Sequence, residues 1–229
     1  MTIYSATQNY YENFSDVHDM TQFERDVLKI RFIQRVCDFL ETKTKTRMSA
    51  NNAYAVAASL YARMSDRTLH YHTPVHIMAI FDFARTNYMD LKSWEELAIV
   101  FHDAIYEPSA ANCMNEHSSA LFMQAMLHPY IEEEVIDEVY NAIIATSQHL
   151  ENEEVDQKFH RLLDLDICNF AMPREDYKKT GILVRKEFEV DEQAWNEGKK
   201  DSATSASIPC RTPDATHSLR VAVLLCSSN

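Results

Sequence analysis

Apolar residues recur at intervals of three and four along most of the chain, which is the spacing that predicts amphipathic α-helices. This spacing predicts helices over residues 22–40, 50–64, 74–88, 93–103, 115–127, 131–149, 159–170 and 173–190. No segment shows the convincing alternation of apolar and polar residues that is typical of a half-buried strand. We therefore expect an all-α fold.

Several of these helices have recognisable starts. Thr73 is a favoured N-cap residue and Pro74 suits the first helical position, so a helix is expected to begin there. The segment 93–96, Ser-Trp-Glu-Glu, has the pattern of a capping box. Asn115 is expected to cap the following helix. These starts place several His and Asp side chains at or near helix ends.

The pair His102-Asp103 lies at the end of the apolar run 99–104. Because burying unpaired ionisable groups is costly, the pair needs a partner, and coordination of a divalent cation provides one. Candidate partners occur at or near the ends of other predicted helices. The predicted ligand set is His76, His102, Asp103 and Asp166. Imidazole and carboxylate ligands suit Mn, Fe, Ni, Mg or Zn, and we expect one or two ions per chain.

A bound divalent ion lowers the pKa of water and polarises a phosphoryl oxygen, so the predicted chemistry is hydrolysis. His72 precedes the start of its helix and is predicted to protonate the leaving oxygen. His149 is predicted to be either a second-metal ligand or a substrate contact. In contrast, His18-Asp19 lies in a polar stretch without partners and is expected to be plain surface.

Composition narrows the choice of function. Two glycines in 229 residues disfavour turn-rich β architectures and Gly-rich phosphate loops. A net charge of −13 argues against DNA binding, although a bound cation can still attract a small anionic substrate. Five scattered cysteines indicate free thiols in a reducing compartment. With neither a signal sequence nor a run of ~20 apolar residues, we expect a cytoplasmic protein with no membrane partner.

The chain resembles the HD-domain metal-dependent phosphohydrolases, in particular their bacterial and phage branch. The matching segments run in family order over about half the chain: Tyr71–Ile77, Phe101–Tyr106, Asn115–Ala120, Thr146–His149, Leu162–Asp166 and Val184–Phe188. The first two segments also look like the corresponding elements of cyclic-nucleotide phosphodiesterases, in which the first His donates a proton and the second binds metal.

This resemblance implies the helical bundle of an HD domain, with His72 as the acid and the four ligands named above. It favours Asp166 over Asp164 as the ligand, because the closing motif of the family places its ligand just before Leu or Ile. The substrate would be a small phosphate ester or a nucleotide. Three further residues would shape its pocket: Asn115, Glu116 and Arg185.

The sequence divides into an irregular segment 1–20, an HD-type helical domain 21–200 and an atypical tail 201–229. The tail is nearly uncharged and departs from the family pattern, either as a disordered end or as one altered by a shifted reading frame. Two alternatives to a hydrolase stay open. One is a di-iron oxygenase on the same scaffold, which would recruit His149 and His117, and the other is a non-catalytic binding module or decayed product.

Overall fold

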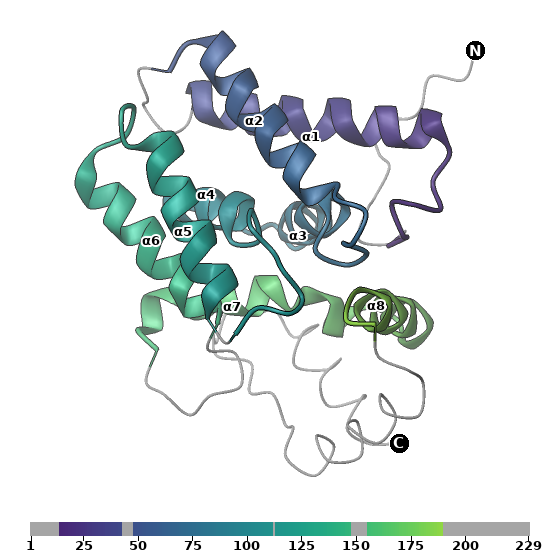
Figure 1. Ribbon diagram of the computed structural model, residues 1–229. Helices are drawn as coiled ribbons and strands as arrows, with labels where there is room; N and C mark the ends of the chain where they lie inside the picture. The colour runs from purple at the N-terminus through teal and green to yellow at the C-terminus, as the bar shows by residue number, and fades with distance from the viewer. Residues whose placement is uncertain (1–13, 43–47, 112, 148–154, 190–229) are drawn as a thin grey trace.

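The computed structural model describes residues 14–42, 48–111, 113–147 and 155–189 (Figure 1). These residues form helices and no strands, so the all-α prediction is confirmed. The α-helices are α1 (Gln22–Thr42), α2 (Ala50–Met64), α3 (Pro74–Thr86), α4 (Ser93–Phe101), α5 (Met114–Leu127), α6 (Glu133–Thr146), α7 (His160–Asp166) and α8 (Arg174–Glu187).

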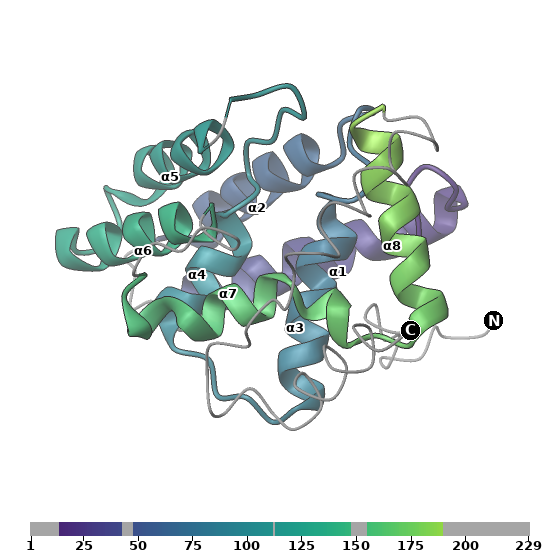
Figure 2. The ribbon, with the colours of Figure 1, turned by 90° about the horizontal axis from the view of Figure 1, so that it is seen from below.

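Helices α3 and α4 form the centre of the molecule. Every residue of α3 from Pro74 to Ala84 is buried, and so is every residue of α4 from Trp94 to Phe101. Burial on all sides is typical of a helix enclosed by others. Helices α1 and α2 pack together on one side, α5 and α6 flank α4, and α7 crosses both central helices (Figures 1 and 2). The start of α3 and the end of α4 therefore face α7.

Two predicted helix caps differ from the structure. The N-cap of α4 is Lys92, whose backbone N–H donates to Glu95 Oε2 at 2.7 Å, so this carboxylate acts one residue earlier than the predicted box requires. Glu96, the residue predicted to close the box, instead accepts a hydrogen bond from Arg35 through Oε1. Asn115 does not cap α5, because its amide is bound to the backbone of Glu107.

Two ion pairs with buried carboxylates and partly exposed arginines fix α4 against its neighbours. Arg161 of α7 donates to both oxygens of Glu95, with the Nε contact at 2.7 Å. Arg35 of α1 donates to Glu96 Oε1 at 2.6 Å. Both carboxylates are only 2% exposed. Because a buried carboxylate without a counter-ion is strongly unfavourable, these pairs hold α1 and α7 in one position along α4.

The predicted helix over 159–170 is divided into three pieces. The 3₁₀ turn η1 (Gln157–Phe159) precedes α7, and η2 (Cys168–Ala171) follows it. The division ends α7 at Asp166, where α7 packs against α3 and α4.

Residues 14–20 contain no helix, yet Phe14 and Val17 are buried. The thiols of Cys37, Cys113 and Cys168 are free. No helix in the described ranges combines the length and the apolar character that crossing a bilayer requires. Residues 1–13, the predicted tail 201–229 and two cysteines, Cys210 and Cys226, lie outside the described residues.

Candidate metal centre

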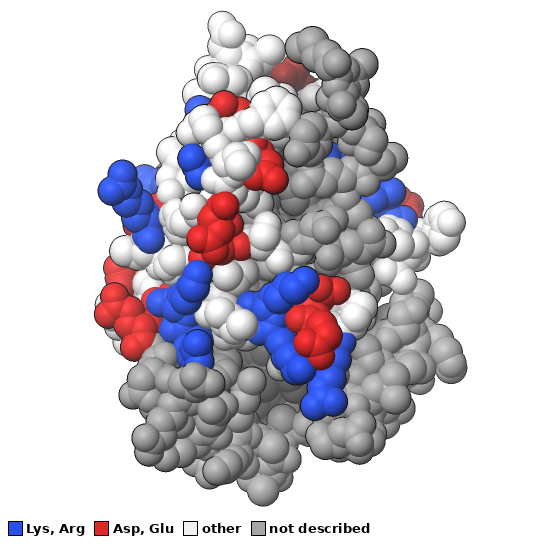
Figure 3. Space-filling view, turned by 90° about the vertical axis from the view of Figure 1, so that its right-hand side faces the viewer, with Lys and Arg blue, Asp and Glu red and all other residues white. Residues whose placement is uncertain are grey.

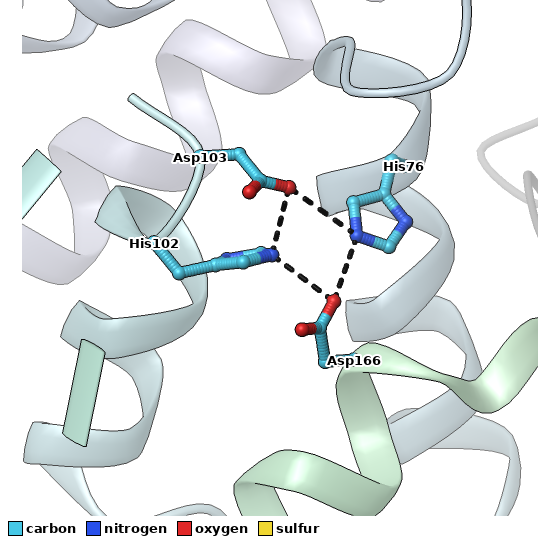
Figure 4. A group of neighbouring side chains, drawn as sticks. All are labelled: His76, His102, Asp103 and Asp166. Atoms are coloured by element: carbon cyan, nitrogen blue, oxygen red, sulfur yellow. Dashed lines mark hydrogen bonds and ion pairs between the residues drawn. The ribbon is translucent and has the colours of Figure 1, made fainter. Parts of the chain in front are cut away.

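The four predicted ligands meet where α3, α4 and α7 converge (Figure 4). His76 lies on the first turn of α3, His102 and Asp103 directly follow α4, and Asp166 ends α7. One ligand atom from each side chain lies within 4.8 Å of the other three. We call these four residues the metal cluster.

Nitrogen and oxygen atoms alternate around the metal cluster. His102 Nε2 lies 2.9 Å from Asp103 Oδ2 and 3.1 Å from Asp166 Oδ1. His76 Nε2 lies 3.1 Å from the same Asp166 oxygen and 3.7 Å from Asp103 Oδ2. The side chain of Asp166 is 16% exposed, more than the other three, so solvent reaches the cluster at this residue.

The donor set fits a divalent cation better than a closed hydrogen-bond network. His102 Nδ1 faces the carbonyl oxygen of Ile99 at 2.9 Å, so Nδ1 keeps a proton, and in the neutral ring, which is the form that binds a metal, Nε2 carries the lone pair. This lone pair faces carboxylate oxygens. Asp103 Oδ2 is buried, and its 2.9 Å contact with His102 Nε2 does not have the geometry of a hydrogen bond. A cation between the four atoms would satisfy all of them, with the Ile99 carbonyl orienting His102.

The two carboxylates control protonation of His102. Burial alone would lower the pKa of His102, but the charges of Asp103 and Asp166 raise it well above its usual value. Burial alone would raise the pKa of Asp103, and the charge of His102 lowers it. A proton on His102 and a metal ion therefore compete for the same atoms.

His72 lies beside the metal cluster but is not part of it. Its ring centroid is 6.1 Å from that of His76. Glu187 of α8 binds His72 Nδ1 through Oε1. Oε2 of the same carboxylate accepts three backbone N–H groups, those of His70 at 2.8 Å, Tyr71 at 2.8 Å and His72 at 3.1 Å. Since Nδ1 is committed to Glu187, Nε2 is the ring nitrogen available to a ligand.

The surrounding charges favour the protonated form of His72. Burial alone would lower the pKa of His72, but the charge of Asp103, the hydrogen bond that His72 donates to Glu187, and the charge of Glu187 raise it. Burial would raise the pKa of Glu187, and the bond with His72 lowers it. The pair is therefore an imidazolium bound to a carboxylate, the form that a proton donor needs.

Glu187 was not identified from the sequence, because a Glu in a helix rich in Lys, Arg and Glu is typical of a solvated surface. The structure leaves it only 3% exposed. The spacing of residues along α8 did, however, indicate that Glu187 is buried. Thr180, Leu183 and Glu187 are the buried residues of α8, at intervals of three and four, so this carboxylate continues the buried stripe.

Two of the three predicted pocket residues, Asn115 and Glu116, lie on the first turn of α5. Burial, together with the charges of Asp103 and Asp166, raises the pKa of Glu116. Asn115 Oδ1 accepts the Glu107 N–H at 2.9 Å, and Nδ2 donates to the Glu107 carbonyl at 3.1 Å. Both ends of the Asn115 amide are therefore bonded to the loop, and its substrate contact stays a prediction.

The remaining predicted residues have different outcomes. Asp166, rather than Asp164, supplies the carboxylate of the metal cluster, although Asp164 is also buried. Arg185 lies on α8, partly buried, and its phosphate contact stays a prediction. His149 lies outside the described residues.

His117 does not join the metal cluster. It lies on an exposed part of α5, where its Nδ1 is hydrogen-bonded to the Tyr140 hydroxyl of α6 at 2.8 Å. A di-iron site would require this histidine to turn inward. In the described part of the chain, the geometry therefore does not favour the oxygenase alternative.

A second group of possible ligands, Asp16, His18 and His70, lies beyond Glu187. Asp16 Oδ2 contacts His70 Nδ1 and Lys186 Nζ, each at 2.9 Å, and Asp16 Oδ1 accepts the His18 N–H at 3.0 Å. Unlike Asp103, this carboxylate has protein donors on both oxygens, and a lysine already supplies positive charge. The group is an ion-pair network that attaches residues 14–20 to α8.

The prediction that His18 has no partners is therefore wrong. Its Nε2 donates to the carbonyl oxygen of Leu69 at 2.8 Å, a residue 51 positions away that the local sequence could not indicate.

Comparison of the chain with models of protein families, with curated proteins and with solved structures found no match. The metal cluster rests on geometry, and membership of the HD-domain family stays a proposal that rests on sequence motifs.

Proposed function

We propose that this protein is a metal-dependent phosphohydrolase of the HD type that cleaves a phosphate ester or a nucleotide. The observation that carries the proposal is that two distinct features of the structure lie side by side. One is the buried donor set of two His and two Asp, and the other is His72, held by Glu187 outside that set. A site that only stores a metal ion does not need a protonated histidine next to it.

A divalent ion held by the metal cluster would activate a water molecule and polarise a phosphoryl oxygen. His72 would donate its Nε2 proton to the leaving oxygen, while Glu187 retains Nδ1 and stabilises the charged ring. Glu116, whose pKa is raised by burial and by the charges of Asp103 and Asp166, would contact the water or the phosphoryl group.

The test is phosphate release from p-nitrophenyl phosphate and nucleoside monophosphates by metal-depleted protein, resupplied with Mn, Fe, Ni, Mg or Zn singly. We expect turnover that depends on the metal and is lost in Asp103→Ala, with the helical circular dichroism signal largely intact. His72→Gln should lower kcat by about 10²–10⁴-fold while the metal remains bound.

Asp164→Asn is the matched control, because Asp164 is buried on α7 two residues before Asp166 but is not in the metal cluster. It should retain metal and turnover, whereas Asp166→Asn should lose both. Full turnover in Asp103→Ala would refute the proposal. Bound metal without turnover on any phosphate ester would leave a metal-binding module.

A further inference from the structure

Helix α5 holds the segment 105–107, which follows the ligands His102 and Asp103. Ser119 Oγ accepts the Ile105 N–H at 3.0 Å and donates to the Ile105 carbonyl at 3.1 Å. Asn115 makes the same double contact with Glu107, at 2.9 and 3.1 Å. Each side chain thus satisfies both backbone groups of one residue.

The two contacts flank one residue. Asn115 and Ser119 are four positions apart, so they lie on one face of α5, and they bind the residues immediately before and after Tyr106. Ser119 is fully buried, where an unsatisfied hydrogen-bonding group is costly, so the contact resists opening. The backbone of Tyr106 is therefore fixed from both sides.

Tyr106 lies flat on the ring of His72. The two ring centroids are 3.6 Å apart, and their planes differ by 17°. Tyr71 meets His72 edge-on, with centroids 4.9 Å apart and planes at 85°. Phe188 of the α8 C-cap in turn meets Tyr106 edge-on at 6.5 Å. His72 is thus packed between two tyrosines while Glu187 holds one of its nitrogens.

We propose that Tyr106 is a positioning residue for His72, and that Asn115 and Ser119 act on His72 through it. The proposal rests on the function proposed above. A ring held at Nδ1 alone can still tilt about that contact, which would move Nε2 away from the leaving oxygen. The flat contact with Tyr106 removes this freedom, and small errors in the direction of a catalytic group are costly in rate.

The first test measures His72 itself and needs no turnover. Histidine-labelled, metal-depleted protein is studied by NMR, with the His72 signal assigned by its absence in His72→Gln. A stacked aromatic ring shifts the ring C–H signals upfield, so Tyr106→Leu should move them downfield, and Tyr106→Phe should keep them near the wild-type position. Tyr54→Leu, an exposed tyrosine of α2, is the matched control and should leave His72 unmoved.

Asn115→Ala tests the link from α5. This residue makes its two side-chain bonds with Glu107, yet its loss should shift the His72 signals in the same direction as Tyr106→Leu. An unmoved His72 signal in Tyr106→Leu would overturn the positioning role. An unmoved signal in Asn115→Ala would overturn the role assigned to α5.

The second test measures turnover with two leaving groups. Tyr106→Leu should lower kcat by about 10–100-fold for an alkyl phosphate, which needs the acid, and less for p-nitrophenyl phosphate, with KM nearly constant. Tyr106→Phe, which keeps the stacked ring, should retain most of the wild-type kcat for both substrates. Equal losses for both substrates would show a packing role only. If the wild-type protein has no turnover, the proposed function fails, and the NMR test alone decides whether Tyr106 orients His72.

Discussion

At the scale of single residues, Glu187 satisfies four donors with one buried carboxylate, and its effect on stability should depend on pH. The pKa of His72 is raised above 6.5, so its contribution is complete below 6.5 and is lost as the pH rises through the raised value. The pKa of Glu187 is lowered from 4.5, so its contribution is present above 4.5 and is lost as the pH falls through the lowered value. The pair therefore stabilises the fold most between pH 4.5 and pH 6.5.

We expect Glu187→Gln to destabilise the metal-depleted protein by about 1.5–3 kcal/mol within this window, and by less above it as His72 loses its proton. Urea unfolding over a range of pH, with a chelator present, measures the difference. Glu175→Gln, an exposed position on the same helix, is the control and should give a small difference at every pH. A loss in Glu187→Gln that does not vary with pH would contradict the charged pair.

At the scale of elements, α3 ends in a Schellman motif without a glycine. The Met89 N–H donates to the Ala84 carbonyl at 2.9 Å, and the Tyr88 N–H donates to the Arg85 carbonyl at 3.2 Å. Tyr88 occupies the left-handed position with φ 54° and is 95% exposed. An L-residue is strained there, and glycine is not.

Tyr88→Gly should therefore raise the free energy of unfolding by about 1 kcal/mol. Tyr88→Ala removes the exposed ring but keeps Cβ, and it should change stability little. Thermal and urea unfolding of the two variants distinguish strain relief from loss of the ring. Equal stabilisation by Ala would show that the backbone strain is not the cause.

The Glu95–Arg161 pair fixes the helix that carries Asp166. Arg161→Met would leave Glu95 buried without its partner, at a cost of about 3–5 kcal/mol. Metal affinity should also fall, because α7 presents Asp166 to the cluster. Chemical unfolding and metal titration measure the two effects. Lys178→Met breaks an exposed pair with Glu175 and should change neither quantity appreciably, whereas unchanged affinity in Arg161→Met would contradict the link.

At the scale of the whole molecule, the helical periodicity of apolar residues was sufficient to predict the fold class. The apolar residues of α3 and α4 form the core, and the other helices cover it. The metal cluster was predictable because His102 and Asp103 interrupt an apolar run. Glu187 and Tyr106 were missed because their roles depend on contacts with His72 across 115 and 34 positions of the sequence. The cap positions shifted for the same reason, since Arg35 binds Glu96 and Glu107 binds Asn115.

The expectation that the protein does not bind DNA stays a prediction. Figure 3 shows the face that carries α8, where basic and acidic side chains lie together. Lys178 pairs with Glu175 at 2.8 Å, Lys179 with Asp176 at 2.6 Å, and Lys186 with Asp16 at 2.9 Å. With a net charge of −13, we expect no binding to a duplex DNA fragment at physiological salt, as measured by fluorescence anisotropy. Binding that weakens steeply with salt would contradict this expectation.

The central claim is that His76, His102, Asp103 and Asp166 hold a metal ion. The most direct measurement is the metal content of the protein, purified without a chelator or a His tag, for the wild type and for Asp166→Asn and Asp164→Asn. We expect one or two equivalents of a divalent metal in the wild type and in Asp164→Asn, and a loss of at least one equivalent in Asp166→Asn. Equal metal content in Asp166→Asn and the wild type, with both folded, would contradict the claim.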